Sequence, residues 1–321
     1  MNPQLEMIPM RTITPFIVTF LILAIPVVAQ EKIGFRLNPD PGATYSLTMV
    51  MNQTVTQTVD NEEQTLTKNM TLVWEYEVLK KKKSGQAEVK LTYKRVKMSQ
   101  DYGPQNVEYD SDNPPAFLDP SMRSLASLPG AELNVLFAPD GQVEQIRGVD
   151  ELLDKMVKSM ELPENPHKNE IISDLKRQFG ADALKQTLGE ITSFYPEKPV
   201  AVGDEWDKEL SITTGFPMKI SSEYTLGAVS GDTATIEATA RVESGPDSGA
   251  VTMGELNMKY SIQGEQDGTI IVSTVTGLPI RSETNLRFDG TVTVSGVDDE
   301  GPRTWPISSA GTVIVTFVRL E

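Results

Sequence analysis

Among the side chains that could take part in catalysis, carboxylates are by far the most abundant in this sequence. The chain carries 45 Asp and Glu residues, a single histidine and no cysteine. Glycoside hydrolysis needs only two carboxyl groups at the right separation in space, so the composition leaves open a carboxylate-dependent hydrolase. No pair of acids stands out from the rest by its spacing. We therefore assign no catalytic residue and expect that the protein is not an enzyme.

His167 is the single histidine, and it lies between two predicted helices in a gap bounded by Pro163 and Pro166. A catalytic histidine needs a nucleophile and an orienting carboxylate, and a metal-binding histidine needs further ligands at a suitable spacing. Neither pattern surrounds His167, so we interpret it as a solvated loop residue. The sequence also lacks a GxSxG motif, a Walker loop and a dinucleotide fingerprint, and we expect no cofactor.

Asp110 and Asp112 are the candidate metal ligands. They belong to the segment Tyr109-Asp110-Ser111-Asp112-Asn113-Pro114, whose alternating oxygen donors resemble the start of a calcium loop. The glycine and the final glutamate of an EF-hand are missing, and Asp or Asn before proline also forms ordinary turns through hydrogen bonds to the backbone. The turn is the favoured interpretation, and no metal is assigned. We interpret Asp298-Asp299-Glu300 in the same way, as a charged hairpin loop.

The charge balance limits the partners. With 29 basic and 45 acidic residues, the net charge is 29 − 45 = −16, which repels nucleic-acid phosphates and anionic lipid surfaces. We expect no nucleic-acid partner. The acidity is interpreted as a means of keeping the protein soluble, with a cationic ligand or a divalent ion as the less favoured alternative.

The N-terminus has the pattern of an export signal. Arg11 precedes an apolar run from Pro15 to Val28, and small residues before Gln30 suit cleavage by a signal peptidase. The run is shorter than the roughly 20 residues that span a bilayer. We therefore expect residues 1–29 to be a signal peptide, cleaved near Ala29/Gln30, with no membrane span left after processing. The alternative is a segment that is retained as an uncleaved anchor. The mature domain, residues 30–321, is then extracytoplasmic, either periplasmic or secreted.

Residues 40–148 form a first β block. A period of two predicts three long strands, and strands of this length predict a large, curved antiparallel sheet whose other face is polar. The apolar faces of the three strands are Tyr45, Leu47, Met49 and Met51; Met70, Leu72, Trp74, Tyr76 and Val78; and Ala87, Val89, Leu91 and Tyr93.

Residues 149–195 form a helical insert. Apolar residues recur at helical spacing from Val149 to Met160, from Ile171 to Phe179 and from Leu184 to Ile191, which predicts two or three short amphipathic helices. Pro196 to Pro199 ends the insert, and a second β block, residues 199–321, follows it.

The second β block echoes the first. Gly42-Ala43-Thr44-Tyr45 resembles Gly203-Asp204-Glu205-Trp206, and the Asp140-Gly141 turn resembles Thr276-Gly277, which we interpret as an internal duplication. Further strands are predicted at 269–274, 280–288, 291–294 and 312–318. The predicted fold is mainly β, of the α+β class. It has either one large curved antiparallel sheet or two similar β halves, with the helical insert packed over them.

Four segments together resemble a family of uncharacterised exported bacterial proteins, a domain of unknown function found in planctomycete-like genomes. They are Tyr45–Thr58, Tyr109–Asp112, Gly148–Leu153 and Pro196–Trp206. The resemblance covers nearly the whole predicted mature chain. The resemblance implies export and one continuous domain. It implies no catalytic or ligand-binding residue.

Met49, Met51, Met70 and Met98 fall on or near the predicted strand faces. Methionine adapts its shape and lines promiscuous apolar surfaces, although core packing explains the same residues. The favoured function is a noncatalytic envelope protein that binds an apolar, lipid-like or amphiphilic ligand, or that acts as a scaffold for an envelope protein partner. The alternative is the carboxylate-dependent hydrolase, acting on cell-envelope glycan or peptide.

Overall fold

The computed structural model describes residues 31–321 apart from 60–61, 104–105, 164–166, 193, 213–217, 245–250, 254–255 and 296–300. The predicted signal peptide, residues 1–29, lies outside this part of the chain, and so does the predicted loop at Asp298-Asp299-Glu300. Lys32–Glu321 forms one compact unit.

One antiparallel sheet of thirteen strands contains both β blocks of the described chain. Its order is β6-β5-β3-β2-β1-β13-β12-β11-β9-β8-β7, with β4 beside β3 and β10 beside β11. The prediction of a large antiparallel sheet is confirmed, and the two blocks share it. The strands are β1 (Thr44–Val59), β2 (Glu62–Lys81), β3 (Ala87–Asp101), β4 (Asn106–Asp110), β5 (Glu132–Phe137), β6 (Val143–Arg147), β7 (Glu205–Ile212), β8 (Met218–Ser230), β9 (Thr233–Ser244), β10 (Val251–Met253), β11 (Leu256–Ser273), β12 (Pro279–Ser295) and β13 (Arg303–Leu320).

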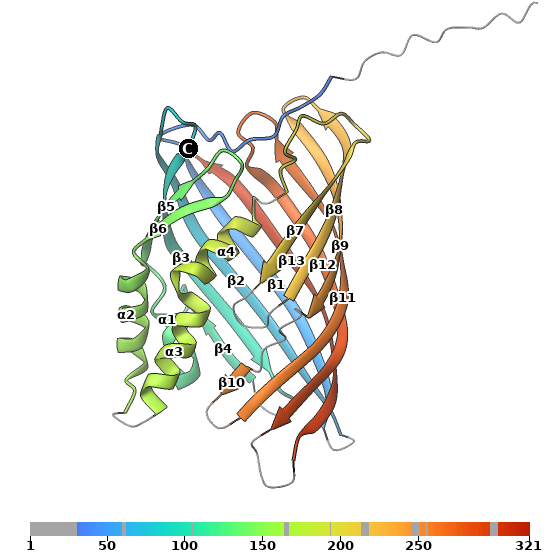
Figure 1. Ribbon diagram of the computed structural model, residues 1–321. Coiled ribbons are helices and arrows are strands. Elements are labelled where there is room, and N and C mark those ends of the chain that lie inside the picture. The colour runs from blue at the N-terminus through green and yellow to red at the C-terminus, as the bar shows by residue number, and fades with distance from the viewer. Residues whose placement is uncertain are drawn as a thin grey trace, which may run out of the picture. The chain divides into compact units, whose positions relative to one another are not determined.

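Short helices cover the opening between the two edge strands, β6 and β7 (Figure 1). The predicted insert forms three of them, α2 (Val149–Met160), α3 (His167–Phe179) and α4 (Ala181–Glu190), while α1 (Arg123–Ala126) follows a 3-10 turn, Pro120–Met122, ahead of β5. Two hydrogen bonds attach the end of the insert to β7. Gln186 Nε2 donates to the carbonyl of Ser211 at 3.0 Å, and Trp206 Nε1 donates to the carbonyl of Phe194 at 2.8 Å.

The strongly curved sheet has a concave face, toward the helices, and a convex outer face (Figure 1). Side chains alternate between the faces along a strand, and directly paired residues of neighbouring strands share a face. At the end of the sheet where β1 begins, the concave face and the helices form one core. Buried members of that core include Leu47, Tyr76, Leu91, Phe137, Leu188 and Phe317.

β12 is one strand where two were predicted. The pair Asp289-Gly290 has the sequence of a hairpin turn, but β12 continues through it from Pro279 to Ser295. A Cβ on Gly290 would lie 2.1 Å from the carbonyl oxygen of Ser261 on β11. This glycine therefore allows a close approach of two strands in a curved sheet, instead of a turn.

The internal duplication stays a prediction, and local correspondences support it. Gly42 and Gly203 have positive φ, 82° and 89°, and their N–H groups donate to the carbonyls of Val78 at 2.8 Å and of Leu226 at 2.7 Å. The strand register then shifts directly after Val78 in β2 and directly after Leu226 in β8. The strand series β6-β5-β3-β2-β1 and β12-β11-β9-β8-β7 lie on either side of β13. The two series meet at β13, and their other ends are the edge strands β6 and β7. The helices lie between these two edge strands.

Tyr76 has a buried hydroxyl without a hydrogen-bond partner in the described part of the chain. Its ring packs on Phe137 and Phe317, with ring centroids 6.2 and 5.5 Å away, and burial raises the pKa of the hydroxyl. Because an unsatisfied buried hydroxyl is costly, we expect Tyr76→Phe to raise the free energy of unfolding by about 1 kcal/mol in urea denaturation.

Tyr195→Phe is the matched control for this prediction. The Tyr195 hydroxyl donates to the carbonyl of Gly277 at 2.5 Å, so its loss is expected to lower the free energy of unfolding by about 1 kcal/mol or more. A Tyr76→Phe variant that unfolds at lower urea concentration than the wild type would show that the hydroxyl has a partner.

Candidate functional site

The candidate site is the part of the concave face that the helices leave half exposed. We call it the lower concave face, and it consists of four rows of directly paired residues on β3, β2, β1, β13 and β12. Of these residues, Val96, Met98, Val315 and Ser309 are buried, and the others are half-buried. The rows are Val96-Leu72-Met49-Val315-Ser282, Met98-Met70-Met51-Val313-Thr284, Gln100-Lys68-Gln53-Gly311-Leu286 and Leu66-Val55-Ser309-Phe288.

Three methionines lie side by side in the second row. Met98 on β3 pairs with Met70 on β2, and Met70 pairs with Met51 on β1. Met49 lies two residues from Met51, on the same face in the next row. The predicted methionine-bearing faces therefore belong to one continuous apolar surface, which flexible thioether side chains make adaptable in shape.

The third row is polar and carries Lys68. Lys68 pairs directly with Gln53 on β1 and with Gln100 on β3, while its neighbours along the strand on the same face, Leu66 and Met70, are apolar. Burial alone lowers the pKa of the Lys68 ammonium group. The described part of the chain provides no hydrogen bond or ion pair to this group.

Lys68 was missed in the sequence, although its signal was present. The predicted apolar face of the second strand includes Met70 and Leu72, and the same period of two, extended back by one step, reaches Lys68. Its isolation could not be predicted, because the residues opposite it depend on the register of β2 with β1 and with β3.

Gln53 fixes the polar character of the third row. Its Nε2 donates to Ser309 Oγ at 3.1 Å, and Ser309 is one of the few buried polar residues of the described chain, at 5% exposed. This hydrogen bond gives one amide N–H of Gln53 and the hydroxyl oxygen of Ser309 a partner within the sheet. The Gln53 amide is therefore held, whereas Lys68 beside it is not.

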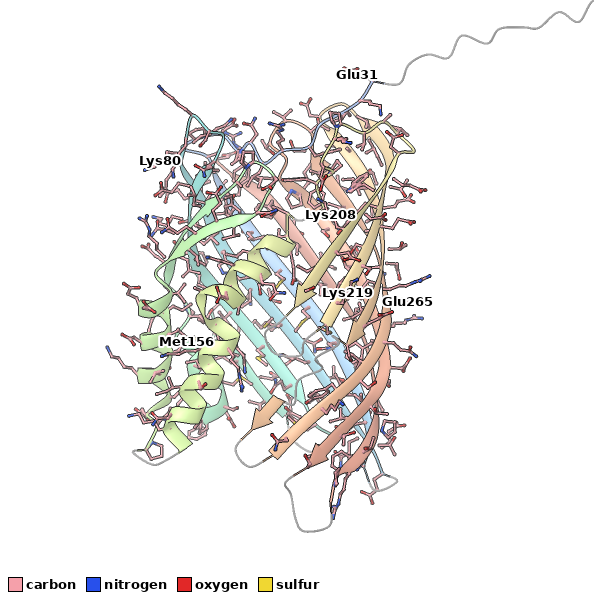
Figure 2. All side chains as sticks on the ribbon, in the orientation of Figure 1. Glu31, Lys80, Met156, Lys208, Lys219 and Glu265 are labelled. Carbon is pink, nitrogen blue, oxygen red and sulfur yellow. The ribbon has the colours of Figure 1, made fainter. Side chains whose placement is uncertain are left out.

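The lower concave face carries no carboxylate. None of the residues in its four rows is Asp or Glu, and continuing the rows across β11, β9, β8 and β7 adds Lys208 but no acid. Lys208 is labelled on β7 in Figure 2. A chain with a net charge of −16 thus presents a concave surface whose only charged residues in these rows are lysines.

Acidic residues gather on the outer face instead. Figure 2 shows Glu265 on the outer side of the sheet, and strand alternation places Lys219, the neighbour of the buried Ile220, on the same side. A shallow outer groove of about 500 Å³ is lined by Glu237, Asp267 and Glu283, among others. Arg281 pairs with Glu283 at 2.8 Å, and Asn285 donates to Asp267 at 3.0 Å. These contacts neutralise or satisfy two of the three acids.

The other half of the concave face is filled by the helices. Between α4 and the sheet the remaining cavity has a volume of about 10 Å³, which is about the volume needed for one water molecule. Its walls include Leu188 of α4 and Leu47, Tyr76 and Phe317 of the sheet. The helices therefore leave no ligand-sized space in this half, and the half-exposed rows are the part of the concave face that they do not fill.

Glu190 is the last residue of α4, and desolvation raises the pKa of its carboxyl group from 4.5 to about 7. The residue itself reaches solvent, so protein surrounds the carboxyl group without sealing it from water, and the effect on stability is smaller than for a sealed group. A raised carboxyl pKa means that the folded state holds a proton between pH 4.5 and about 7 that the unfolded state has released.

Glu190 therefore predicts a pH dependence. Because the folded state binds more protons, its stability falls as the pH rises from 4.5 to about 7. Glu190→Gln removes this contribution. In thermal unfolding, the melting temperature of the variant relative to the wild type is expected to rise across this window and to stay constant above it. A difference independent of pH would show that Glu190 has an ordinary pKa.

Asp110 and Asp112, the candidate metal ligands, lie around one guanidinium group. Arg95 Nε and a terminal nitrogen donate to Asp110 at 3.0 and 2.6 Å, and Arg95 lies 3.1 Å from Asp112. The backbone N–H of Asp112 also donates to Asp110 Oδ1 at 3.1 Å. These hydrogen bonds lower the pKa of Asp110, and they support the turn rather than a calcium loop.

His167 is the first residue of α3, and its side chain lies outside the described part of the structure. Within the residues that the structure describes, no three acidic or histidine side chains gather as a metal site would require. The described helices are all too short or too polar to cross a membrane.

A family model matches residues 84–279 of this sequence, more than half of the chain, and its description is "Family of unknown function (DUF6263)". The chain belongs to this family. The DUF6263 region contains β3, the helices and the strands up to β11, and the strands that carry Lys68 and Met51 lie before it. No curated protein has a matching sequence.

Solved structures show distant likenesses to this DUF6263 protein. A structure of lipid–protein interactions in lipovitellin has a TM-score of 0.43 and 13% identity, over 86% of this chain and 25% of that chain. This chain thus spans a quarter of the lipovitellin chain. An outer membrane channel from Pseudomonas putida F1 has a TM-score of 0.19 and 8% identity, over 87% and 97% of the two chains. OpdQ from Pseudomonas aeruginosa has a TM-score of 0.18 and 7% identity, over 87% of this chain and 99% of that chain. Likenesses this distant carry no functional information.

Proposed function

We propose that this protein binds an apolar or amphiphilic ligand on its lower concave face, without catalysing a reaction. The binding is proposed to take place outside the cytoplasm, in the periplasm or after secretion, once a signal peptide has been cleaved near Ala29/Gln30. The apolar N-terminal run from Pro15 to Val28 supports export.

One observation carries the binding proposal, namely the half-exposed methionine row and its neighbours. Met51, Met70, Leu72 and Phe288 are apolar and half-buried, although core residues elsewhere on the same sheet are fully buried. A soluble protein gains from burying such surface, and contiguous exposed apolar surface is a mark of binding sites. The adaptable thioethers suit a ligand of variable shape, such as a hydrocarbon chain.

The test is binding of N-phenyl-1-naphthylamine, a neutral probe that fluoresces in apolar sites, to the protein purified without its first 29 residues. Saturable binding near one probe per chain, together with native mass spectrometry that finds a copurified apolar molecule, is the expected result. Absence of probe binding to both the purified and the lipid-extracted protein would refute the proposal. A protein partner captured on a scaffold surface would then become the leading explanation.

Glu190 is the observation that favours the hydrolase alternative, because its raised pKa is typical of a general acid. Glycoside hydrolysis needs a second carboxylate roughly 5 to 10 Å away. The four rows of the lower concave face, where binding is proposed, contain no carboxylate at all, so the noncatalytic proposal has the stronger support for that surface. Hydrolysis of cell-envelope glycan or peptide that is lost in Glu190→Gln would reverse this ranking.

A further inference from the structure

We propose that the ligand of the lower concave face is an anionic amphiphile whose head group pairs with Lys68 and whose hydrocarbon tail lies along the methionine row. This inference rests on the proposed function and specifies its ligand class. The head group is a carboxylate or phosphate oxygen, and the tail is a chain long enough to cover Met70 and Leu72.

Lys68 is a half-buried cation with no ion-pair or hydrogen-bond partner among the described residues. Leu66 and Met70 flank it along β2, and the two residues opposite it are the neutral side chains Gln53 and Gln100. No charged residue contributes to its pKa, which burial alone lowers. The ammonium group has lost part of its hydration, and no residue of the described chain pairs with it, a costly arrangement that an anion can relieve.

The charge pattern favours an anion at this place. The outer face of the sheet mixes acids with bases, as in the pairs Lys219–Glu209 and Arg281–Glu283. The lower concave face and its continuation toward β7 carry lysines without an acid. The net charge of −16 repels anions from the outer surface. Because the overall charge opposes anions, the attraction for an anion at this place must come from direct contact with Lys68.

The apolar rows set the size of the tail. Lys68 and Leu72 lie on the same face four residues apart, which is about 13 Å along a strand. Met70 lies between them, with Met51 and Met98 beside it. A hydrocarbon chain that starts at the Lys68 ammonium group thus meets apolar side chains in the direction of the helices. In the other direction it meets Leu66 and Val55.

Two fluorescent probes that differ only in charge test this inference. They are 12-(9-anthroyloxy)stearate, an anion, and its neutral methyl ester. The wild type is expected to bind the anion about tenfold more tightly than the ester. Lys68→Met is expected to remove this preference while still binding the ester, and Lys68→Arg is expected to keep it.

Lys259→Met is the matched control. Lys259 is an exposed lysine whose strand neighbours on β11, Met258 and Tyr260, face the concave side, so the variant makes the same change of charge on the outer face. It is expected to keep the preference for the anion. Lys68→Met is also expected to melt at a higher temperature than the wild type, because an unpaired half-buried charge has been removed, and this separates lost binding from misfolding.

Competition identifies the source of the anion. Displacement of the anionic probe by stearate indicates a carboxylate head group, and displacement by lysophosphatidate indicates a phosphate head group. Either result supports the inference. Inorganic phosphate that displaces the probe equally well would refute it, because the site would then bind an anion without a tail.

The failures of the two proposals are distinguishable. Equal affinity of the wild type for the anion and the ester would overturn the role of Lys68 and leave apolar binding intact. So would an unchanged preference in Lys68→Met. If neither probe binds, the proposed function fails, and the inference fails with it.

Discussion

Met70→Glu is expected to weaken the binding of N-phenyl-1-naphthylamine by about tenfold or more. Met70 lies in the centre of the methionine row, paired directly with Met51 and Met98. A bound probe would remove water from a carboxylate at this position, which is costly. A neutral probe forms no ion pair that could compensate for this cost. The measurement is a fluorescence titration of the variant and the wild type under the same conditions.

Thr71→Glu is the control, since Thr71 is the next residue of β2 and points to the outer face. It makes the same new charge at nearly the same place in the fold, and the affinity is expected to stay within about twofold. Met70→Gln, which is polar but uncharged, is expected to weaken binding less than Met70→Glu does. Equal affinities of Met70→Glu and Thr71→Glu would place the binding site elsewhere on the molecule.

The strands and helices could be predicted from the sequence because the periodicity that identifies each of them is local. Alternation from Tyr45 to Met51 predicted β1, and the helical spacing of Val149, Leu152 and Met156 predicted α2, whose buried residues include these three. In both cases the residues that repeat are the ones the fold turns toward its interior. Local periodicity therefore identifies the element and the face together.

The site was only half predictable, because it depends on register. The methionines were recognised as strand residues, but their alignment in one row follows from pairing of β1 with β2 and of β2 with β3. A register shifted by one residue would turn every side chain of a strand to the other face. Pairing of β1 with β13 joins residues that are far apart in the sequence, such as Gln53 and Ser309, which are 256 positions apart, and no local pattern predicts it.

Gly290 shows how one residue type misleads in a curved sheet. Asp-Gly is a strong hairpin signal, yet Gly290 allows a close approach to Ser261 inside a continuous strand. Gly264 is similar, since its Cβ would lie 2.2 Å from the carbonyl oxygen of Arg287. Glycine in a long strand therefore marks sheet curvature as well as turns. The curvature in turn creates the concave face on which the proposed binding depends.

The helical insert covers the opening between the edge strands β6 and β7. A substitution of Leu188 tests how much its packing on the sheet contributes to the free energy of unfolding. This residue of α4 is 6% exposed, and together with Leu47, Tyr76 and Phe317 it lines the small remaining cavity. Leu188→Ala is expected to lower the free energy of unfolding by about 2–5 kcal/mol, because the lost contacts leave a larger cavity that a packed sheet cannot refill.

Thr187→Ala is the control, because Thr187 is the exposed residue directly before Leu188 in the same helix. This variant is expected to change the free energy of unfolding by less than about 0.5 kcal/mol. Urea denaturation of both variants gives the comparison. Equal stabilities would mean that packing of Leu188 against the sheet does not hold α4 in place.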